Sequence, residues 1–184
     1  SIRIAELNIA VLNDLYKSDP TWSIMHLRYF NPVGAHSSGL IGEDISKKAT
    51  NLMPIICNVA NGKLDYLKIF GKDYDTEDGT AIRDYIHVVD LAEGHLKALE
   101  KLSFEKGVWT FNLGTGSGCT VLNLVKIFEK ANKIKIPYKF FDRREGDIES
   151  SFADVEKVKE TLEWKSKRTL EDMCIDSWRW CSKN

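Results

Sequence analysis

Two segments place arginine beside carboxylates in a pattern that suits the binding of an anion. Arg83 follows the turn signal Asp-Gly-Thr at 78–80 and precedes a short apolar run at 85–89, so we expect it at a strand edge. Segment 143–147, Arg-Arg-Glu-Gly-Asp, holds four charged residues around a glycine. A fixed guanidinium can form two parallel hydrogen bonds with a phosphate or a carboxylate. Two interpretations stay open: an anion clamp that Arg83 completes, or an Arg83–Asp84 ion pair beside a solvated turn.

A helix follows the apolar run. Asp90 and Glu93 have the spacing of a capping box, in which each side chain satisfies a free N–H group at the helix start. This spacing predicts a helix that begins at Asp90. Its apolar face, at the 3.6-residue period of a packed helix, is predicted to comprise Leu91, Ala92, His95, Leu96, Leu99 and Leu102.

Two further segments have the composition of helix starts or nucleotide loops. Asn51 precedes an apolar stripe with Pro54 in its first turn, which favours an N-cap. Segment 114–118, Gly-Thr-Gly-Ser-Gly, follows a predicted strand. Its third glycine comes one residue too early for a dinucleotide loop, and no acidic residue ends a strand ~20 residues later. We therefore expect a tight strand-to-helix turn, with Thr120 as the cap of the next helix.

The elements that carry these residues alternate between strands and helices, which favours an α/β fold with a partly parallel sheet. A break at 31–34 and a long loop over 34–50 interrupt the pattern. The predicted strands are 23–30, 67–70, 85–89, 108–113 and 136–141. The predicted helices are 1–17, 51–62, 90–102, 120–128, 154–162 and a last one from 169.

Composition excludes several classes of protein. The 184 residues are 43% hydrophobic with a net charge of -1, so no basic surface indicates binding to nucleic acid or a membrane. No apolar run approaches the roughly 20 residues of a membrane span, and the first ten residues break any signal-peptide core. Four isolated histidines show no metal-ligand spacing, so we expect no metal site. The four cysteines lack a Cys-x-x-Cys pair and are expected to be reduced core residues of a cytoplasmic protein: Cys57, Cys119, Cys174 and Cys181.

Seven segments, in this order and over essentially the whole chain, resemble UDP-glucose 4-epimerase, an extended short-chain dehydrogenase/reductase. They are Arg-Tyr-Phe-Asn-Pro-Val-Gly-Ala at 28–35, Asn-Leu-Met-Pro at 51–54, Ile-Phe-Gly at 69–71, Thr-Glu-Asp-Gly-Thr at 76–80, Arg-Asp-Tyr-Ile-His-Val at 83–88, Phe-Asn-Leu-Gly at 111–114 and Arg-Arg-Glu-Gly-Asp at 143–147.

The resemblance corresponds to the second half of that family's fold. It implies the C-terminal part of a Rossmann-like NAD(P)-binding domain, with its last helices and strands at 1–33 and 82–115. It also implies a smaller α/β domain, mainly for UDP-sugar binding, at 34–81 and 116–184. Full-length members are often homodimers.

The family interconverts UDP-galactose and UDP-glucose through a 4-keto sugar, with bound NAD taking up and returning a hydride. Because the 4-keto sugar must rotate between the two hydride transfers, most of the binding energy is expected to come from contacts with the UDP part. By resemblance, Arg83 and Arg144 hold the pyrophosphate and Asp147 the ribose. The other implied substrate residues are Asn31, Asn51, Leu52, Leu67, Lys68, Ile69, Phe70, Tyr85 and Ser151. The residues implied to lie near the NAD nicotinamide are Tyr29, Phe30, Asn31 and Pro32.

Ser151 bears on the choice of sugar. The family carries either tyrosine or a small residue at this position, and a small one leaves volume for an acetamide group. The resemblance therefore implies that UDP-GlcNAc and UDP-GalNAc are accepted too.

Parts of the family's machinery are missing from the sequence. Its glycine-rich NAD loop has no counterpart here, so NAD would be bound mainly by an N-terminal half. Its Tyr-x-x-x-Lys pair falls at Ser1 and Ala5, neither of which can act as the base. We expect either a fragment or a degenerate copy, inactive alone. The alternatives are a related nucleotide-sugar dehydratase or decarboxylase, and a non-catalytic UDP-sugar-binding module.

Overall fold

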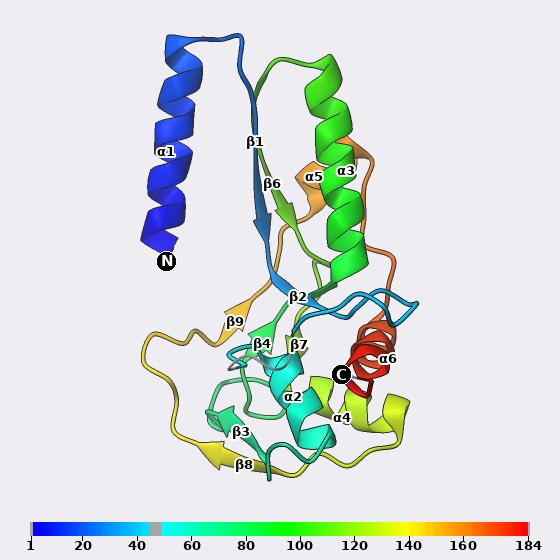
Figure 1. Cartoon of the computed structure of the whole chain (residues 1–184). Helices are drawn as coiled ribbons and strands as arrows, with labels where there is room; N and C mark the ends of the chain where they lie inside the picture. Colours follow the sequence, from blue (N-terminus) through cyan, green and yellow to red (C-terminus); the bar gives the residue numbers. More distant parts are fainter. Residues whose placement is uncertain (1, 45–48, 184) are drawn as a thin grey trace.

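The computed structural model describes residues 2–44 and 49–183, which form an α/β fold (Figure 1). The helices are α1 (Ile2–Ser18), α2 (Leu52–Ala60), α3 (Val88–Phe104), α4 (Val121–Asn132), α5 (Glu156–Leu162) and α6 (Leu170–Cys181). The strands are β1 (Ser23–Tyr29), β2 (Asn31–Val33), β3 (Leu67–Phe70), β4 (Ile82–Arg83), β5 (Tyr85–His87), β6 (Gly107–Leu113), β7 (Cys119–Thr120), β8 (Tyr138–Phe141) and β9 (Ser150–Ser151).

The strands pair mainly in parallel, as the alternation of elements predicts. Strand β1 lies parallel to β6, β2 to β5, and β3 to β8. Strand β4 pairs with β7 in antiparallel and with β9 in parallel. Figure 1 shows the β1–β6 pair with α1 and α3 at one end of the molecule, and the β3–β8 pair with α2 and α4 at the other.

The strand break lies at Phe30, not at 31–34. The Phe30 N–H donates to Leu113 O at 3.2 Å, and the Asn31 N–H donates to Asp84 O at 3.0 Å. The chain therefore changes strand partner here, leaving β6 and joining the segment of β5. Pairing resumes at once as β2, in which proline is tolerated because, among the described residues, this strand pairs on one side only, with β5.

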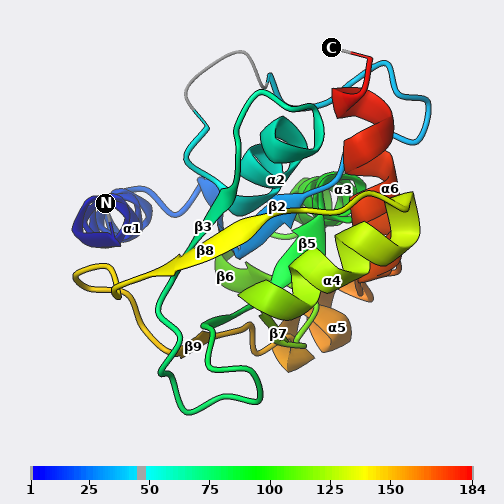
Figure 2. The same cartoon turned by 90° about the horizontal axis from the view of Figure 1, so that it is seen from below.

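Two apolar clusters hold the elements together. The larger lies among α2, α4, α6 and β3, and Figure 2 shows these helices behind the β3–β8 pair. It includes the large side chains of Ile56, Phe128 and Met173 and all four cysteines, which are buried in the core as predicted. The smaller cluster joins α3, α5 and β6 around Phe111 and Leu113.

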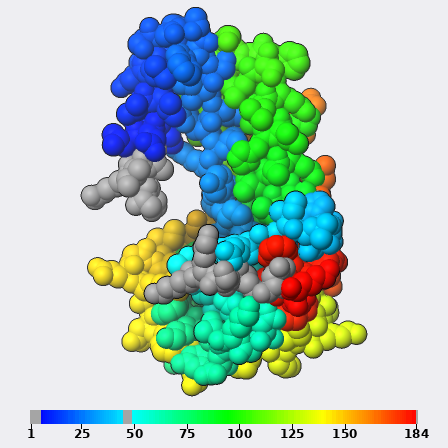
Figure 3. Space-filling model, in the orientation of Figure 1, coloured from blue at the N-terminus to red at the C-terminus, as the bar shows by residue number. Residues whose placement is uncertain are grey.

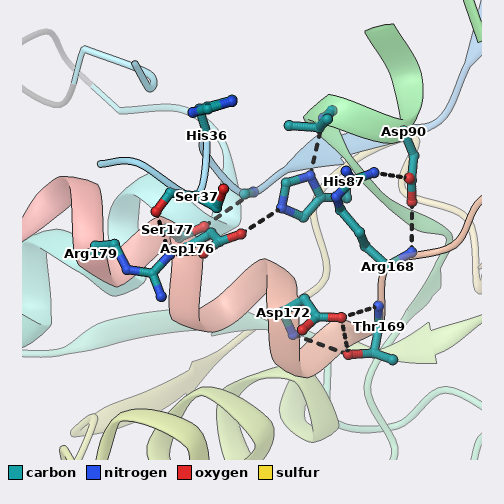
Figure 4. A network of polar contacts seen from close by, with 12 residues as sticks. His36, Ser37, His87, Asp90, Arg168, Thr169, Asp172, Asp176, Ser177 and Arg179 are labelled. Atoms are coloured by element: carbon teal, nitrogen blue, oxygen red, sulfur yellow. Dashed lines mark hydrogen bonds and ion pairs between the residues drawn. The ribbon is translucent and has the colours of Figure 1, made fainter. Parts of the chain in front are cut away.

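Helix α3 begins two residues before its predicted start. His87 is the N-cap: its Nδ1 accepts from the Val89 N–H at 3.0 Å. The predicted Asp90 cap is wrong, because the buried Asp90 carboxylate accepts from the backbone N–H groups of Lys167 (3.0 Å) and Arg168 (2.9 Å). It also pairs with the Arg168 guanidinium (Figure 4). Asp90 thus fastens α3 to the segment before α6.

The predicted buried face of α3 is also wrong in most members. Leu96 and Leu99 are each 60% exposed, while Gly94 and Ala98 face the core. A Cβ at Gly94 would lie 3.1 Å from Leu113 Cδ1 and 3.2 Å from Trp164 Cε2. Close packing therefore selects small residues on this face, and the larger leucines point outward.

Helix α1 likewise leaves apolar side chains in contact with solvent. Leu7 is 63% exposed and Val11 is 59% exposed. Within the described residues, β1 pairs with β6 alone. Figure 3 shows α1 and α3 together at one end of the molecule.

Candidate functional site

A cavity of about 400 Å³ lies among β2, β3, β4 and the start of α2, within the size range of small-molecule sites. It gathers residues from five of the sequence segments. The predicted residues that line it are Phe30, Asn31, Pro32, Asn51, Leu52, Leu67, Lys68, Ile69, Phe70, Arg83, Tyr85, Arg144 and Asp147.

Arg83 lies on strand β4 with its side chain largely buried. Its Nη1 donates to Ile82 O at 2.7 Å, and its Nη2 forms an ion pair with Asp147. The alternative of an Arg83–Asp84 ion pair is wrong, because successive residues of an extended segment point to opposite sides. The cavity therefore receives a guanidinium that is already oriented by a carboxylate and a carbonyl.

The Asp84 side chain points away from the cavity and binds the glycine-rich turn. Its carboxylate accepts from Thr115 N (2.9 Å), Thr115 Oγ1 (2.6 Å), Gly116 N (3.0 Å) and Ala153 N (3.1 Å). A Cβ at Gly114 would lie 2.5 Å from Asp84 Oδ2. The backbone N–H groups of this turn thus surround a carboxylate of the protein itself. The turn leads through β7 into α4, capped by Thr120 as predicted.

The side chains of the two neighbouring arginines of segment 143–147 have different partners. The Arg144 guanidinium lies over the Phe70 ring, 3.9 Å from its centroid, and lines the cavity. Arg143 instead pairs with Asp73 at 2.8 Å and stacks on Tyr74, outside the cavity lining. Stacking on an aromatic ring fixes the plane of the Arg144 guanidinium beside that of Arg83.

Asn51 is the N-cap of α2, as predicted, but its side chain makes no cap hydrogen bond. It lines the cavity instead, next to Leu52. The start of a helix presents free N–H groups and a positive dipole end, which favour an anion there. Tyr85 also lines the cavity, and burial raises the pKa of its hydroxyl.

Two predicted residues are outside the lining. Ser151 on β9 is in register with Arg83 on β4, so it lies one strand away. Tyr29 is 56% exposed, and its ring centroid is 6.3 Å from that of His95. Ser1 lies outside the described residues, and Ala5 is in α1.

The lining also contains residues that the sequence did not reveal, namely Val33, Thr50, Met53, Ile55, Ala81 and Val121. Most are apolar wall positions with no distinguishing sequence signal.

In the part of the chain that the structure describes, no three His, Cys, Asp or Glu residues cluster as a metal would require. Among the same residues, no helix has both the length and the apolar character of a membrane span.

The model of the NAD dependent epimerase/dehydratase family matches residues 4–114. The chain is 58% identical over 174 residues to the UDP-glucose 4-epimerase of Bacillus subtilis (strain 168), covering 95% of this chain and 51% of that protein. The corresponding human enzyme is 51% identical, with coverage of 95% and 50%. This chain therefore spans about half the length of the curated relatives it matches.

Solved structures agree with this relationship. UDP-glucose 4-epimerase from Stenotrophomonas maltophila, with bound NAD and formylated UDP-arabinopyranose, superimposes with a TM-score of 0.94 at 45% identity, covering 96% of this chain and 53% of that one. The Bifidobacterium longum enzyme, in complex with NAD+ and UDP, gives 0.92 at 47% identity, with coverage of 97% and 53%. The chain belongs to the NAD dependent epimerase/dehydratase family, and the predicted α/β, Rossmann-like fold is confirmed.

Proposed function

We propose that this chain supplies the UDP-sugar site of a UDP-glucose 4-epimerase, which interconverts UDP-galactose and UDP-glucose through a 4-keto sugar. The observation that carries the proposal is the cavity itself, in which Arg83, Arg144, Asp147 and Asn51 converge from separate segments. The names of the relatives support the same substrate class.

The charges of the cavity suit a nucleoside diphosphate. Two guanidinium groups, Arg83 and Arg144, can each donate two parallel hydrogen bonds to phosphate oxygens. Asp147 holds Arg83 in place and would accept hydrogen bonds from a ribose. The short strand β3, with Lys68 and Phe70 in the lining, would contact a uracil mostly through its backbone groups.

The sugar would lie near Asn31, with fewer charged groups around it. This difference matches a reaction in which UDP stays fixed while the hexose turns. Ser151 is small and lies in register with the lining residue Arg83, on the neighbouring strand, and we propose that N-acetylated UDP-sugars are accepted as well. In the full-length enzyme, Ser151→Tyr should abolish turnover of UDP-GlcNAc and UDP-GalNAc and preserve turnover of UDP-glucose. Equal loss for both sugar classes would contradict this assignment.

The described residues fit only the nicotinamide end of NAD. Phe30, Asn31 and Pro32 lie at the cavity where the chain changes strand partner. The glycine-rich turn at 114–118 cannot hold the NAD pyrophosphate, because its N–H groups bind Asp84. NAD supplies the hydride acceptor and donor of this reaction when it is bound. We infer that its pyrophosphate is held by the other half of the protein, and that the chain is inactive alone.

Several properties of the whole protein remain part of this proposal. The order of the motifs favours the C-terminal half of the epimerase. The residues 1–33 and 82–115 would complete the Rossmann-like domain, and 34–81 and 116–184 would mainly form the UDP-sugar domain. Exposed leucines on α1 and α3 support a homodimer, which light scattering would test on the full-length protein. A cytoplasmic location is consistent with the reduced cysteines.

The experiment is a calorimetric titration of UDP into this chain and three arginine variants. We expect a Kd between about 10 μM and about 1 mM for the unchanged chain. Arg83→Ala and Arg144→Ala should each weaken binding roughly 10- to 100-fold, because hydrogen bonds to charged groups contribute ~1.5–3 kcal/mol. Arg143→Ala is the matched control: it removes the same charge from the adjacent position, outside the cavity lining.

Equal weakening by all three variants would show a general effect of net charge and would overturn the assignment of the cavity. Absence of UDP binding by a chain that still unfolds cooperatively would also contradict a preformed UDP site.

A further inference from the structure

A second cavity, of about 500 Å³, lies between the 34–43 loop, α2 and the end of α6. Its lining is mostly apolar and contains none of the charged residues assigned to UDP. Two thiols from different helices form part of it, Cys57 on α2 and Cys181 on α6. Exposed residues of the loop, His36, Ile41 and Glu43, also belong to the lining, so the cavity opens to solvent. Cys181 keeps an exposed fraction of 5%, whereas Cys57 is fully buried, so a small solute in the cavity meets the pair at Cys181.

Asn61 links the backbones of these two cysteines. The Asn61 N–H donates to Cys57 O at 2.9 Å, and the Asn61 Nδ2 donates to Cys181 O at 2.9 Å. Both side chains also line the same cavity, and a hydrogen bond between the two thiols is the main influence on the pKa of each. Helices α2 and α6 are thus joined next to the sulfur atoms, which restricts movement of one sulfur away from the other.

The shared hydrogen bond makes the two thiols unequal. It raises the pKa of Cys57, which burial raises further. The same bond lowers the pKa of Cys181, and Lys63 acts in the same direction, although burial and Glu43 oppose the effect. Cys181 is therefore the better nucleophile of the pair, since the thiolate is the reactive form of cysteine.

We propose that Cys57 and Cys181 form a peroxide-sensitive dithiol that closes to a disulfide between α2 and α6. The Cys181 thiolate attacks a hydroperoxide, the O–O bond breaks, and a sulfenic acid and an alcohol or water result. The Cys57 thiol then attacks the sulfenic sulfur, an S–S bond forms, and water leaves. In total, two thiols lose two protons and two electrons, and one peroxide is reduced to water and an alcohol or a second water.

The disulfide would bear on the neighbouring cavity through α2. Its sulfur atoms must approach from hydrogen-bond distance to the ~2.05 Å of a disulfide bond. Met53, one turn before Cys57, lines both cavities, and Asn51 stands at the start of the same helix. The chemistry of the dithiol itself does not depend on the function proposed for the UDP site.

The test treats the folded chain with hydrogen peroxide, blocks the remaining thiols with an alkylating reagent under denaturing conditions, and maps the peptides by mass spectrometry. We expect an intramolecular link between Cys57 and Cys181, a mass lower by two hydrogen atoms, and recovery of both thiols with a reductant. Cys119 and Cys174, which are outside the cavity lining, should remain alkylatable.

Two variants separate the steps. Cys57→Ser should accumulate a sulfenic acid at Cys181 that a dimedone probe traps, with no disulfide. Cys174→Ser, which removes another cysteine of the same helix, should form the disulfide as the unchanged chain does. A link that involves Cys119 or Cys174, a link between chains only, or irreversible oxidation of Cys181 without a disulfide would overturn the proposal. The peptide map of the unchanged chain decides the question even where a variant fails to fold.

Discussion

The buried carboxylate of Asp84 offers a sharp test of how the cavity is held, because it lies between two lining residues, Arg83 and Tyr85. Asp84 is 0% exposed and accepts hydrogen bonds from three backbone N–H groups and one hydroxyl. Asp84→Asn keeps the shape of the side chain. It replaces one acceptor oxygen by an NH2 group that faces donors.

The magnitude follows from these contacts. Hydrogen bonds to a charged group contribute ~1.5–3 kcal/mol each, and leaving a buried donor unpaired costs about 1–3 kcal/mol. Since the amide oxygen still accepts from part of the set, we expect a loss of roughly 2–4 kcal/mol in the free energy of unfolding. That is a large share of a typical stability of about 5–15 kcal/mol.

Urea denaturation followed by circular dichroism measures this loss, with Asp14→Asn as the control. Asp14 pairs with Lys17 on the surface of α1, where both side chains are 74% exposed. The control should change the unfolding free energy by less than about 0.5 kcal/mol. If Asp84→Asn cost under about 1 kcal/mol, the carboxylate would not be the anchor of the turn.

Two further predictions concern the surrounding framework. Burial lowers the pKa of His87 against the opposing effect of Asp176, so the folded state takes up a proton less readily than the unfolded state. The unfolding free energy should therefore fall as pH drops below about 6.5, with a slope of up to about 1.4 kcal/mol per pH unit. His87→Asn keeps an acceptor for the cap and should reduce the pH dependence of the unfolding free energy, measured by chemical denaturation. An unchanged slope would refute the assignment of this dependence to His87. Thr169→Ala, which breaks the capping box with Asp172, should cost about 1 kcal/mol in the same assay, whereas no measurable cost would mean that the cap does not stabilise α6.

The sequence predicts the type and order of most elements because their apolar periods and caps are local. The helix start at Thr169 and the cap at Thr120 were predicted from residue types and apolar periods alone, and both residues are N-caps in the structure. The strand at 67–70 has the predicted bounds for the same reason.

The sequence-based predictions are wrong where tertiary contacts determine the role of a residue. Asp90 has the spacing of a cap but is drawn into bonds with the 167–168 backbone, far away in sequence. The leucines of α3 match a helical period, yet close packing at Gly94 places small residues inward. The periodicity of a helix identifies an apolar face, whereas its neighbours determine which face is buried.

The candidate site was predictable as a set of residues through the resemblance, and its geometry was not. From residue types, Arg143 and Arg144 are equivalent, and only the fold sends one to Asp73 and the other to Phe70. The same holds for Arg83, whose partner is Asp147 and not its neighbour Asp84.

Side chains along segment 83–85 point to alternate sides of the strand, which explains how this cavity is both formed and stabilised. Arg83 and Tyr85 point into the cavity, while Asp84 between them anchors the turn at 114–118 and the backbone at Ala153. The anchored side chain of Asp84 therefore helps to position the cavity-lining residue on each side of it, while itself pointing away from the cavity. If this is correct, Asp84→Asn should weaken UDP binding by displacing Arg83 even under conditions where the variant is fully folded. Retention of full UDP affinity by a destabilised variant would show that the two roles are independent.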